Sequence, residues 1–265
     1  MIETRPDWCV SRQRVWGVPL PIFVNKKTKE ILVDDSVVEN IASIYEQEGS
    51  DCWFSDDPQR FLGNKYKAAD YEKLTDIVEV WFDSGSTHSF VLEKREDLKW
   101  PASMYLEGSD QHRGWFHSSL LESCGTRGRA PFDSILSHGF VVDGKGLKMS
   151  KSLGNVIAPE DILKKYGADI LRIWVASSNY AEDLRIDYAI LDQHADSYRK
   201  IRNTFRYLLG NINDNFEIIN YETIDVDGLP ELEQLMLHKI YILNDNFKKY
   251  FKNYDFHNLY KELLN

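Results

Sequence analysis

Hydrophobic and polar positions divide the chain into a first part that mixes strands with helices and a second part that is helical. Short apolar runs at 77–81, 104–107 and 135–142 predict buried strands. Apolar residues then recur with the spacing of an amphipathic helix. These helical stretches begin at Pro159, Asp187, Leu229 and Phe256. The pattern therefore predicts an α/β region followed by an α-helical one.

Two of the helical stretches carry a clear apolar stripe. Pro159 opens a stretch whose apolar positions keep the helical period as far as Trp174, which predicts one helix packed on the sheet. The stretch from Ile190 to Leu209 has a single apolar stripe, and its cations lie mostly off that stripe. Those cations are Arg199, Lys200, Arg202 and Arg206.

The segment at 8–23 combines Arg and Trp with two prolines, which confines it to an edge strand or an extended entry. Arg12 and Arg14, beside Trp16, fit two alternatives. One is an aromatic-capped edge strand, and the other is a site for a phosphate backbone or a nucleotide tail.

Residues 25–76 turn polar and acidic and contain a helix-like run at 36–47. We expect an insertion into the main fold whose role is packing or contact with a partner. It contains no residue with recognisable chemistry.

The segment at 77–88 is expected to run from a strand through an Asp-Ser-Gly turn into a helix. Such a turn would place Trp81 and Asp83 at the carboxyl end of a strand, where α/β folds bind ligands. A Trp in this place is also common in a protein core, so both interpretations stay open.

A second segment, at 104–116, has the same design. Its strand ends in Glu107, Gly108 permits a close backbone approach, and Ser109 is expected to cap a helix that starts at Asp110. On that helix Gln111 and Trp115 are four residues apart and would share a face. The alternative is structural, with Glu107 in a salt bridge and Asp110 interacting with the helix dipole.

The third segment is a basic loop after the strand at 135–142. Its core, Lys148 to Ser152, reads KMSKS, and Asp143-Gly144 and Lys145-Gly146 are turn dipeptides. Lysines, hydroxyls and backbone N–H groups suit a polyphosphate. A solvated surface turn is the alternative for such a run in isolation.

Composition narrows the class of protein. The chain has 265 residues, which is enough for two domains. It has no apolar run long enough to span a membrane and no secretory signal, so we expect a soluble, cytoplasmic protein. Cys9, Cys52 and Cys124 are far apart, so we expect core thiols rather than a disulfide or a zinc site. The net charge of −10 opposes nucleic-acid binding, although the basic segments remain suitable.

Together the KMSKS loop, the Trp-rich opening, the WFDSG turn and the EGSDQHRGW turn resemble class I aminoacyl-tRNA synthetases. Within that family, 76–88 and 105–116 are similar to the isoleucine enzymes, and the valine and leucine enzymes differ there. The resemblance implies an α/β fold: residues 1–176 would be the second half of a Rossmann-type catalytic domain. Residues 177–265 would begin an α-helical anticodon-binding domain, truncated in mid-helix.

The resemblance also implies a reaction. Isoleucine attacks the α-phosphate of ATP, and the resulting adenylate is passed to tRNA(Ile), with Mg²⁺ assisting on the phosphates. Lys148 and Lys151 would be the catalytic residues that hold the developing charge. The residues implied to bind ATP or the adenylate are Glu107, Gly108, Asp110, Gln111, His138, Met149, Ser150 and Ser152. The resemblance further implies an isoleucine pocket walled by Trp81 and Trp115, tRNA contacts at Arg199, Lys200, Arg202 and Arg206, and a monomeric parent enzyme.

The sequence departs from the family in two respects: none of its seven histidines lies in a His-x-Gly-His signature, and it has no editing domain. We therefore expect an excised piece that begins after the editing domain and is inactive alone, with its lysines in an open or disordered loop. A second hypothesis is a stand-alone tRNA-binding or regulatory paralogue. A third, an active valine or leucine synthetase, disagrees with 76–88 and 105–116.

Overall fold

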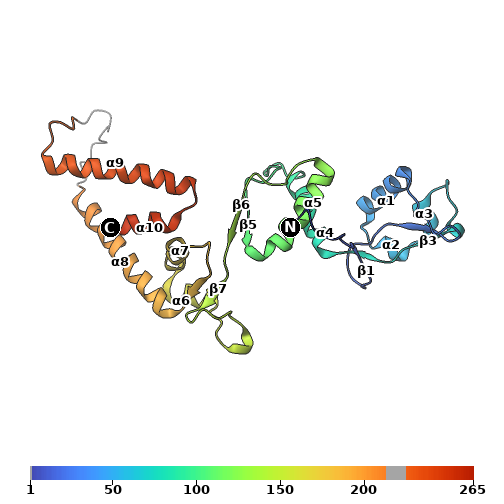
Figure 1. Cartoon of the computed structure of the whole chain (residues 1–265), viewed down its shortest axis with the longest axis horizontal. Coiled ribbons are helices and arrows are strands. Elements are labelled where there is room, and N and C mark those ends of the chain that lie inside the picture. Colours follow the sequence, from blue (N-terminus) through green and yellow to red (C-terminus); the bar gives the residue numbers. More distant parts are fainter. Residues whose placement is uncertain (1, 213–224) are drawn as a thin grey trace. The chain divides into compact units, whose positions relative to one another are not determined.

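The computed structural model describes residues 2–212 and 225–265 (Figure 1). Internal contacts divide the chain into two compact units, Met1–Leu136 and Ser137–Asn265. Each unit has its own hydrophobic residues buried against one another. They are therefore described one at a time.

The polar insertion has a small core of its own. Strand β2 (Phe23–Asn25) pairs antiparallel with β3 (Tyr71–Lys73), so that Phe23 lies opposite Lys73. The chain between them forms α1 (Asp35–Glu48), α2 (Cys52–Ser55), α3 (Pro58–Leu62) and the short 3-10 helix η1 (Ala68–Asp70). Trp53 and Phe61 are fully buried at its centre. The insertion is thus stabilised by its own apolar contacts.

The predicted strand at 77–81 is shorter than expected. β4 (Ile77–Val78) pairs antiparallel with β1 (Ser11–Arg12), and helix α4 (Val80–Gly85) begins directly afterwards. The Glu79 side chain accepts a hydrogen bond from the Trp81 N–H at 3.0 Å, which starts the helix. The predicted Asp-Ser-Gly turn is therefore wrong, because those residues lie inside α4. A π-helical turn, η2 (His88–Leu92), follows it.

The strand at 104–107 is confirmed as β5 (Tyr105–Gly108), but the helix after it differs from the prediction. The chain forms a 3-10 helix, η3 (Ser109–Arg113), and α5 (Trp115–Arg127) begins only after Gly114. Ser109 makes no capping hydrogen bond, so its predicted role is wrong. The Gln111 amide oxygen instead accepts from the Trp115 N–H at 3.1 Å, which interrupts the single helix that spacing suggested.

The predicted strand at 135–142 is two strands. β6 (Ile135–His138) ends before Gly139, and β7 (Val141–Asp143) pairs in parallel with β8 (Leu184–Ile186). Gly139 donates its N–H to the Tyr180 carbonyl at 2.9 Å, and a Cβ at Gly139 would overlap the backbone of Glu182. This close approach turns the chain and breaks the apolar run.

The helix predicted from Pro159 to Trp174 is also two helices, α6 (Pro159–Tyr166) and α7 (Ala168–Ser177). Gly167, at φ 83°, lies between them in a conformation that ends the first helix. The helical period predicted that apolar residues of this stretch pack on one side, and apolar residues of both helices do pack against the same core. The buried members of that core are Ile162, Ile170, Trp174, Leu184, Ile186 and Leu191.

The remaining helices are α8 (Tyr188–Asn211), α9 (Glu231–Lys252) and α10 (Phe256–Leu264). The apolar stripe of α8 is buried only at its beginning. Leu191 is 0% exposed, whereas Phe205 is 62% and Leu209 is 67% exposed. A continuous apolar stripe therefore did not predict a continuously buried face.

Two further expectations concern whole-chain properties. Within 2–212 and 225–265, no helix combines the length and the apolar character needed to cross a membrane. Cys52 is buried as expected, but Cys9 and Cys124 are exposed, so the prediction of three core thiols is wrong for two of them. Cys9 belongs to the extended entry, and Cys124 lies on an exposed part of α5.

The break at Gly139 predicts a stability effect. Gly139→Ala should lower the unfolding free energy of the second unit by about 1–3 kcal/mol, because the added methyl overlaps backbone that has no room to move. Gly210→Ala in α8 is the matched control, since nothing lies within 4 Å of its Cβ position, and it should raise stability by about 0.5–1 kcal/mol. Native-state hydrogen exchange at the β7 and β8 amides measures both. Equal protection in the two variants would contradict the prediction.

Candidate functional site

The turn between β5 and α5 in the first unit is organised by the Trp115 side chain. Its indole Nε1 donates to the Ser84 carbonyl of α4 at 2.9 Å, and its ring stacks on Tyr105 of β5 with centroids 4.2 Å apart and planes 12° apart. Its backbone N–H is held by Gln111. One residue thus joins α4, β5 and η3, and α4 and α5 lie side by side (Figure 1).

Trp81 reaches the same place from α4. A Cβ at Gly114 would lie 2.9 Å from the Trp81 ring and 2.9 Å from the Gln111 amide oxygen, so the absent side chain at Gly114 makes room for both. Trp81 is 41% exposed, and Trp115 is half-buried. The structure therefore brings Trp81, Gln111 and Trp115 together around Gly114, which the sequence analysis did not single out.

The acidic residues of this turn face solvent. Glu107 and Asp110 are exposed, whereas Gly108 between them is buried. Neither carboxylate forms an ion pair within the part of the chain that the structure describes, so the structural alternative of a strand-end salt bridge is not observed. The Asp110 carboxylate accepts one long hydrogen bond, from Gln111 Nε2 at 3.4 Å, so both carboxylates keep oxygens that a ligand could reach.

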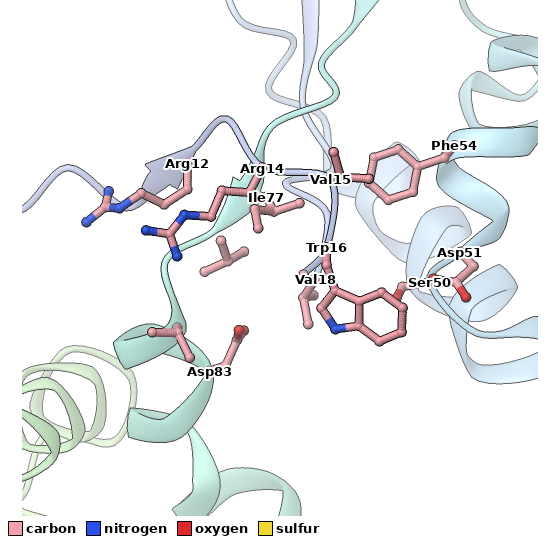
Figure 2. A pocket seen from close by; sticks show the side chains of 13 residues that line it. Arg12, Arg14, Val15, Trp16, Val18, Ser50, Asp51, Phe54, Ile77 and Asp83 are labelled. Carbon is pink, nitrogen blue, oxygen red and sulfur yellow. The ribbon is translucent and has the colours of Figure 1, made fainter. Parts of the chain in front are cut away.

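A pocket of about 570 Å³ lies beside the N-terminal entry segment (Figure 2). Arg12 and Arg14 project in the same direction, and Asp83 extends from α4 into the pocket (Figure 2). Trp16 lines the pocket and is 92% exposed, so it does not cap the edge strand. Burial, and then the negative charge of Glu79, raise the pKa of Asp83.

The Arg12 guanidinium makes hydrogen bonds to the backbone of its own segment. Its guanidinium donates to the carbonyls of Cys9 at 2.7 Å and Ser11 at 2.8 Å and lies 3.9 Å from Glu79. Arg14 has no ion pair among the described residues. Of the two alternatives for this segment, the exposed Trp16 and the uncommitted Arg14 favour the site for a phosphate backbone.

The basic loop belongs to the second unit and has a defined conformation. Lys148 pairs antiparallel with Val142, and a 3-10 helix, η4 (Lys151–Leu153), follows, capped by the Ser150 hydroxyl. Lys148 and Lys151 are both exposed. Both lysine side chains thus lie on the surface of this loop, for which the sequence analysis expected an open or disordered conformation.

Asn155 explains the order of the loop. Its amide oxygen accepts from the Ser150 N–H at 2.9 Å, and its amide nitrogen donates to Asp143 at 2.9 Å and to the Lys148 carbonyl at 3.3 Å. The sequence analysis missed Asn155. The available signal in the sequence was the pair Gly154-Asn155, because Asn side chains often bond to nearby backbone in turns. In the structure Gly154 adopts φ 65°, as a turn requires.

The other residues named for this loop have mixed surroundings. Met149 packs against the core of the second unit, and the Ser150 and Ser152 hydroxyls are 3.1 Å apart. His138 is the last residue of β6, is half-buried, and donates from Nδ1 to the Gly139 carbonyl at 2.7 Å. Ser152 and the two lysines are thus available to a ligand, whereas Met149 anchors the loop.

The four cations of α8 are exposed on the helix surface. Arg199 forms an ion pair with Asp196 at 2.8 Å, one turn earlier on the same helix. Across the described ranges, no group of three or more His, Cys, Asp or Glu side chains is arranged to hold a metal ion.

The sequence of the chain was compared with those of known proteins. The family described as tRNA synthetases class I (I, L, M and V) matches residues 1–187. An isoleucine–tRNA ligase of Pelagibacter ubique is 86% identical over the whole chain, and one of Mesorhizobium japonicum is 50% identical over the whole chain. The chain spans 29% and 26% of the lengths of these two relatives.

Solved structures share the fold at low sequence identity. LeuRS of Agrobacterium radiobacter K84, in a ternary complex with tRNA and LeuAMS, matches 97% of this chain and 34% of its own, with a TM-score of 0.72 and 18% identity. Methionyl-tRNA synthetase of Mycobacterium tuberculosis, in complex with methionyl-adenylate, matches 92% of this chain and 58% of its own, with a TM-score of 0.51 and 14% identity.

The family match includes all three segments that the sequence analysis singled out, the two Trp-bearing turns of the first unit and the basic loop of the second. It covers 187 of 265 residues. The chain belongs to the class I tRNA synthetase family.

Proposed function

We propose that this chain is the part of an isoleucine–tRNA ligase that carries one side of the adenylate-forming site and the start of the tRNA-binding helices. The observation that carries the proposal is the Trp81, Gln111 and Trp115 arrangement around Gly114, in a chain 86% identical to an isoleucine–tRNA ligase. The parent enzyme would join isoleucine to ATP and transfer it to tRNA(Ile) in the cytoplasm, as a monomer.

In the first unit, Trp81 and Trp115 would form walls of the isoleucine pocket. Indole rings exclude polar and larger side chains by shape and desolvation. Glu107 and Asp110 would accept hydrogen bonds from the ammonium and ribose groups of the adenylate, with Gly108 and Gln111 beside them. Exposure of both carboxylates, with no ion pair among the described residues, supports this role.

In the second unit, Lys148 and Lys151 would neutralise charge that develops on the phosphates of ATP, and Mg²⁺ would share that charge. Ser150, Ser152 and backbone N–H groups would supply neutral donors, and His138 would lie beside the adenine. Fixed charges of this kind act mainly by stabilising the transition state. The hydrogen bonds of Asn155 support this proposal because they link Ser150, which lies between the two lysines, to Asp143 at the base of the loop.

Residues 177–265 would begin the anticodon-binding domain, with Arg199, Lys200, Arg202 and Arg206 toward the tRNA backbone. We also propose that the chain alone is inactive, because its sequence lacks the His-x-Gly-His signature that contacts ATP from the opposite side. No observation favours the alternative of a stand-alone regulatory paralogue.

Binding of a non-hydrolysable isoleucyl-adenylate analogue, measured by isothermal titration, tests the pocket. The chain should bind the isoleucyl analogue at least about tenfold more tightly than the leucyl analogue, since a shaped apolar pocket discriminates by about 1–3 kcal/mol. Gly114→Ala should weaken binding because its methyl contacts Trp81 and Gln111, whereas Gly125→Ala, with nothing within 4 Å, should not. Failure of the unmodified chain to bind would contradict the proposed pocket.

Isoleucine-dependent ATP–pyrophosphate exchange tests the inactivity. The purified chain should exchange at least about a hundredfold more slowly than a full-length relative, because a missing set of phosphate contacts removes transition-state stabilisation. A rate near that of the full-length enzyme would overturn the inactivity and leave the pocket proposal standing.

Salt dependence of tRNA binding tests the four α8 cations. Changing Arg199, Lys200, Arg202 and Arg206 to Ala should weaken binding and reduce the slope of log affinity against log salt by about 3. The matched control changes four exposed lysines of α9, and it should leave the slope nearly unchanged. These lysines are Lys239, Lys248, Lys249 and Lys252. Equal slopes in both variants would show that the α8 cations are only solvated charges.

A further inference from the structure

Three segments of the second unit lie side by side at the base of the basic loop. β7 is in the middle, because Val142 pairs in parallel with Arg185 of β8 and forms an antiparallel bridge with Lys148. Residues that pair across neighbouring strands project their side chains to the same face of a sheet. Arg185 and Lys148 therefore share one face, with the buried Val142 between them.

The alternation of buried and exposed residues supports this placement. Leu184 and Ile186, on either side of Arg185, are buried in the core of the second unit. Met149, next to Lys148, packs against that core. Successive residues of a strand point to opposite faces, so Arg185 and Lys148 both face away from the core. Both residues are exposed, as this arrangement requires.

The Arg185 side chain reaches across β7 to the start of the loop. A Cβ placed on Gly146 would lie 3.5 Å from Nη2, 3.6 Å from Nε and 3.7 Å from Cζ of Arg185. All three atoms belong to the guanidinium, so the charged group itself, and not the aliphatic part of the side chain, lies at Gly146. Gly146 is two residues before Lys148. The fold thus brings a cation from β8 to the loop.

Both cations can reach one phosphate group. Neighbouring strands lie about 4.7–4.9 Å apart, so the backbones at Arg185 and Lys148, on either side of Val142, are about 10 Å apart. The long stems of Arg and Lys let each charged group cover half of that distance. A phosphate that lies over Val142 can therefore contact both side chains.

The Arg185 guanidinium has no ion pair among residues 2–212 and 225–265. The acids two positions before and after it bind backbone groups instead. Asp183 accepts from the Phe140 N–H at 2.8 Å, and Asp187 accepts from the Ile190 N–H at 2.7 Å. The guanidinium is therefore available to an anion from outside the chain.

We infer that Arg185 is a further phosphate-binding residue, which holds the triphosphate of ATP together with Lys148. This inference rests on the proposed function of the basic loop. The planar fork of a guanidinium can donate two parallel hydrogen bonds to one phosphate, whereas an ammonium acts as a point charge. Arg185 would therefore fix the orientation of the phosphate, and Lys148 would add charge. Arg185 lies outside the KMSKS motif, and the pairing of β7 with β8 brings it there.

The grouping of the cations favours a triphosphate over an RNA backbone. Lys145, Lys148 and Arg185 gather around one turn, and Lys151 follows in the next. A triphosphate carries its charges on adjacent groups, which suits cations gathered in this way. A nucleic-acid backbone distributes its charges along a strand.

Isothermal titration of the chain with inorganic tripolyphosphate tests the inference. Arg185→Gln should weaken binding by about tenfold, since charge-assisted hydrogen bonds are lost. Arg185→Lys keeps the charge but lacks the fork, so it should recover only part of the affinity. Arg172→Gln is the matched control and should bind as the unmodified chain does. Arg172 is an exposed arginine of α7 that pairs with Asp169 at 3.2 Å.

Urea unfolding checks that the variants are folded. The Arg185 variants should keep the midpoint of the unmodified chain, because the side chain is exposed and the Trp174 indole bonds only to the Arg185 carbonyl. Weaker binding of tripolyphosphate by Lys148→Ala but not by Arg185→Gln would overturn the inference and leave the proposed role of the loop standing.

Two further outcomes would also overturn the inference. In the first, Arg185→Gln weakens binding of tRNA but not of tripolyphosphate, which would mean that Arg185 contacts RNA. In the second, the unmodified chain shows no saturable binding of tripolyphosphate. That result would overturn the proposed phosphate role of the loop as well, whereas the isoleucine pocket is tested separately by the adenylate analogue.

Discussion

The arrangement of the first unit depends on how the Trp115 indole is held. Its N–H is bonded to Ser84 of α4, its face is stacked on Tyr105 of β5, and its backbone is capped by Gln111 of η3. Any shift of α4 therefore moves Trp81, which lies on that helix and against Gly114. Trp115 thus joins α4, β5 and η3 and is also proposed to line the isoleucine pocket, so packing at this turn and the shape of the pocket are one constraint.

Local patterns predicted the long helices well, but they predicted the strand ends and the break at Gly167 poorly. The run at 36–47 corresponds to Asp35–Glu48, and the stripe from Ile190 to Leu209 lies within Tyr188–Asn211, because helical periodicity and caps are local properties. The strand at 135–142 was broken by Gly139, which meets Glu182 from more than forty positions later in the chain. A contact of that kind has no local sequence signal.

Some residues of the candidate site could also be predicted from local sequence, and others could not. Glu107, Asp110 and Gln111 could be selected from their place after a strand, and the lysines from their place in a glycine-punctuated loop. The supporting residue Gly114 could not, because its importance comes from a tertiary neighbour, the Trp81 ring. Recognisable motifs therefore named the groups that are proposed to face a ligand, and the structure was needed to identify Gly114, which makes room beside them.

Asn155 gives the basic loop a property that matters for any flexible polyphosphate ligand. Ordering a residue costs about 1–2 kcal/mol of conformational free energy at room temperature, so a floppy arm would lose much of its electrostatic gain when it closed on phosphates. Here the Asn155 side chain donates to the Asp143 carboxylate and accepts from the Ser150 N–H, which ties the base of the loop together. Much of that backbone ordering is therefore complete when the chain folds, and an anion bound by the two lysines would have to order only their side chains.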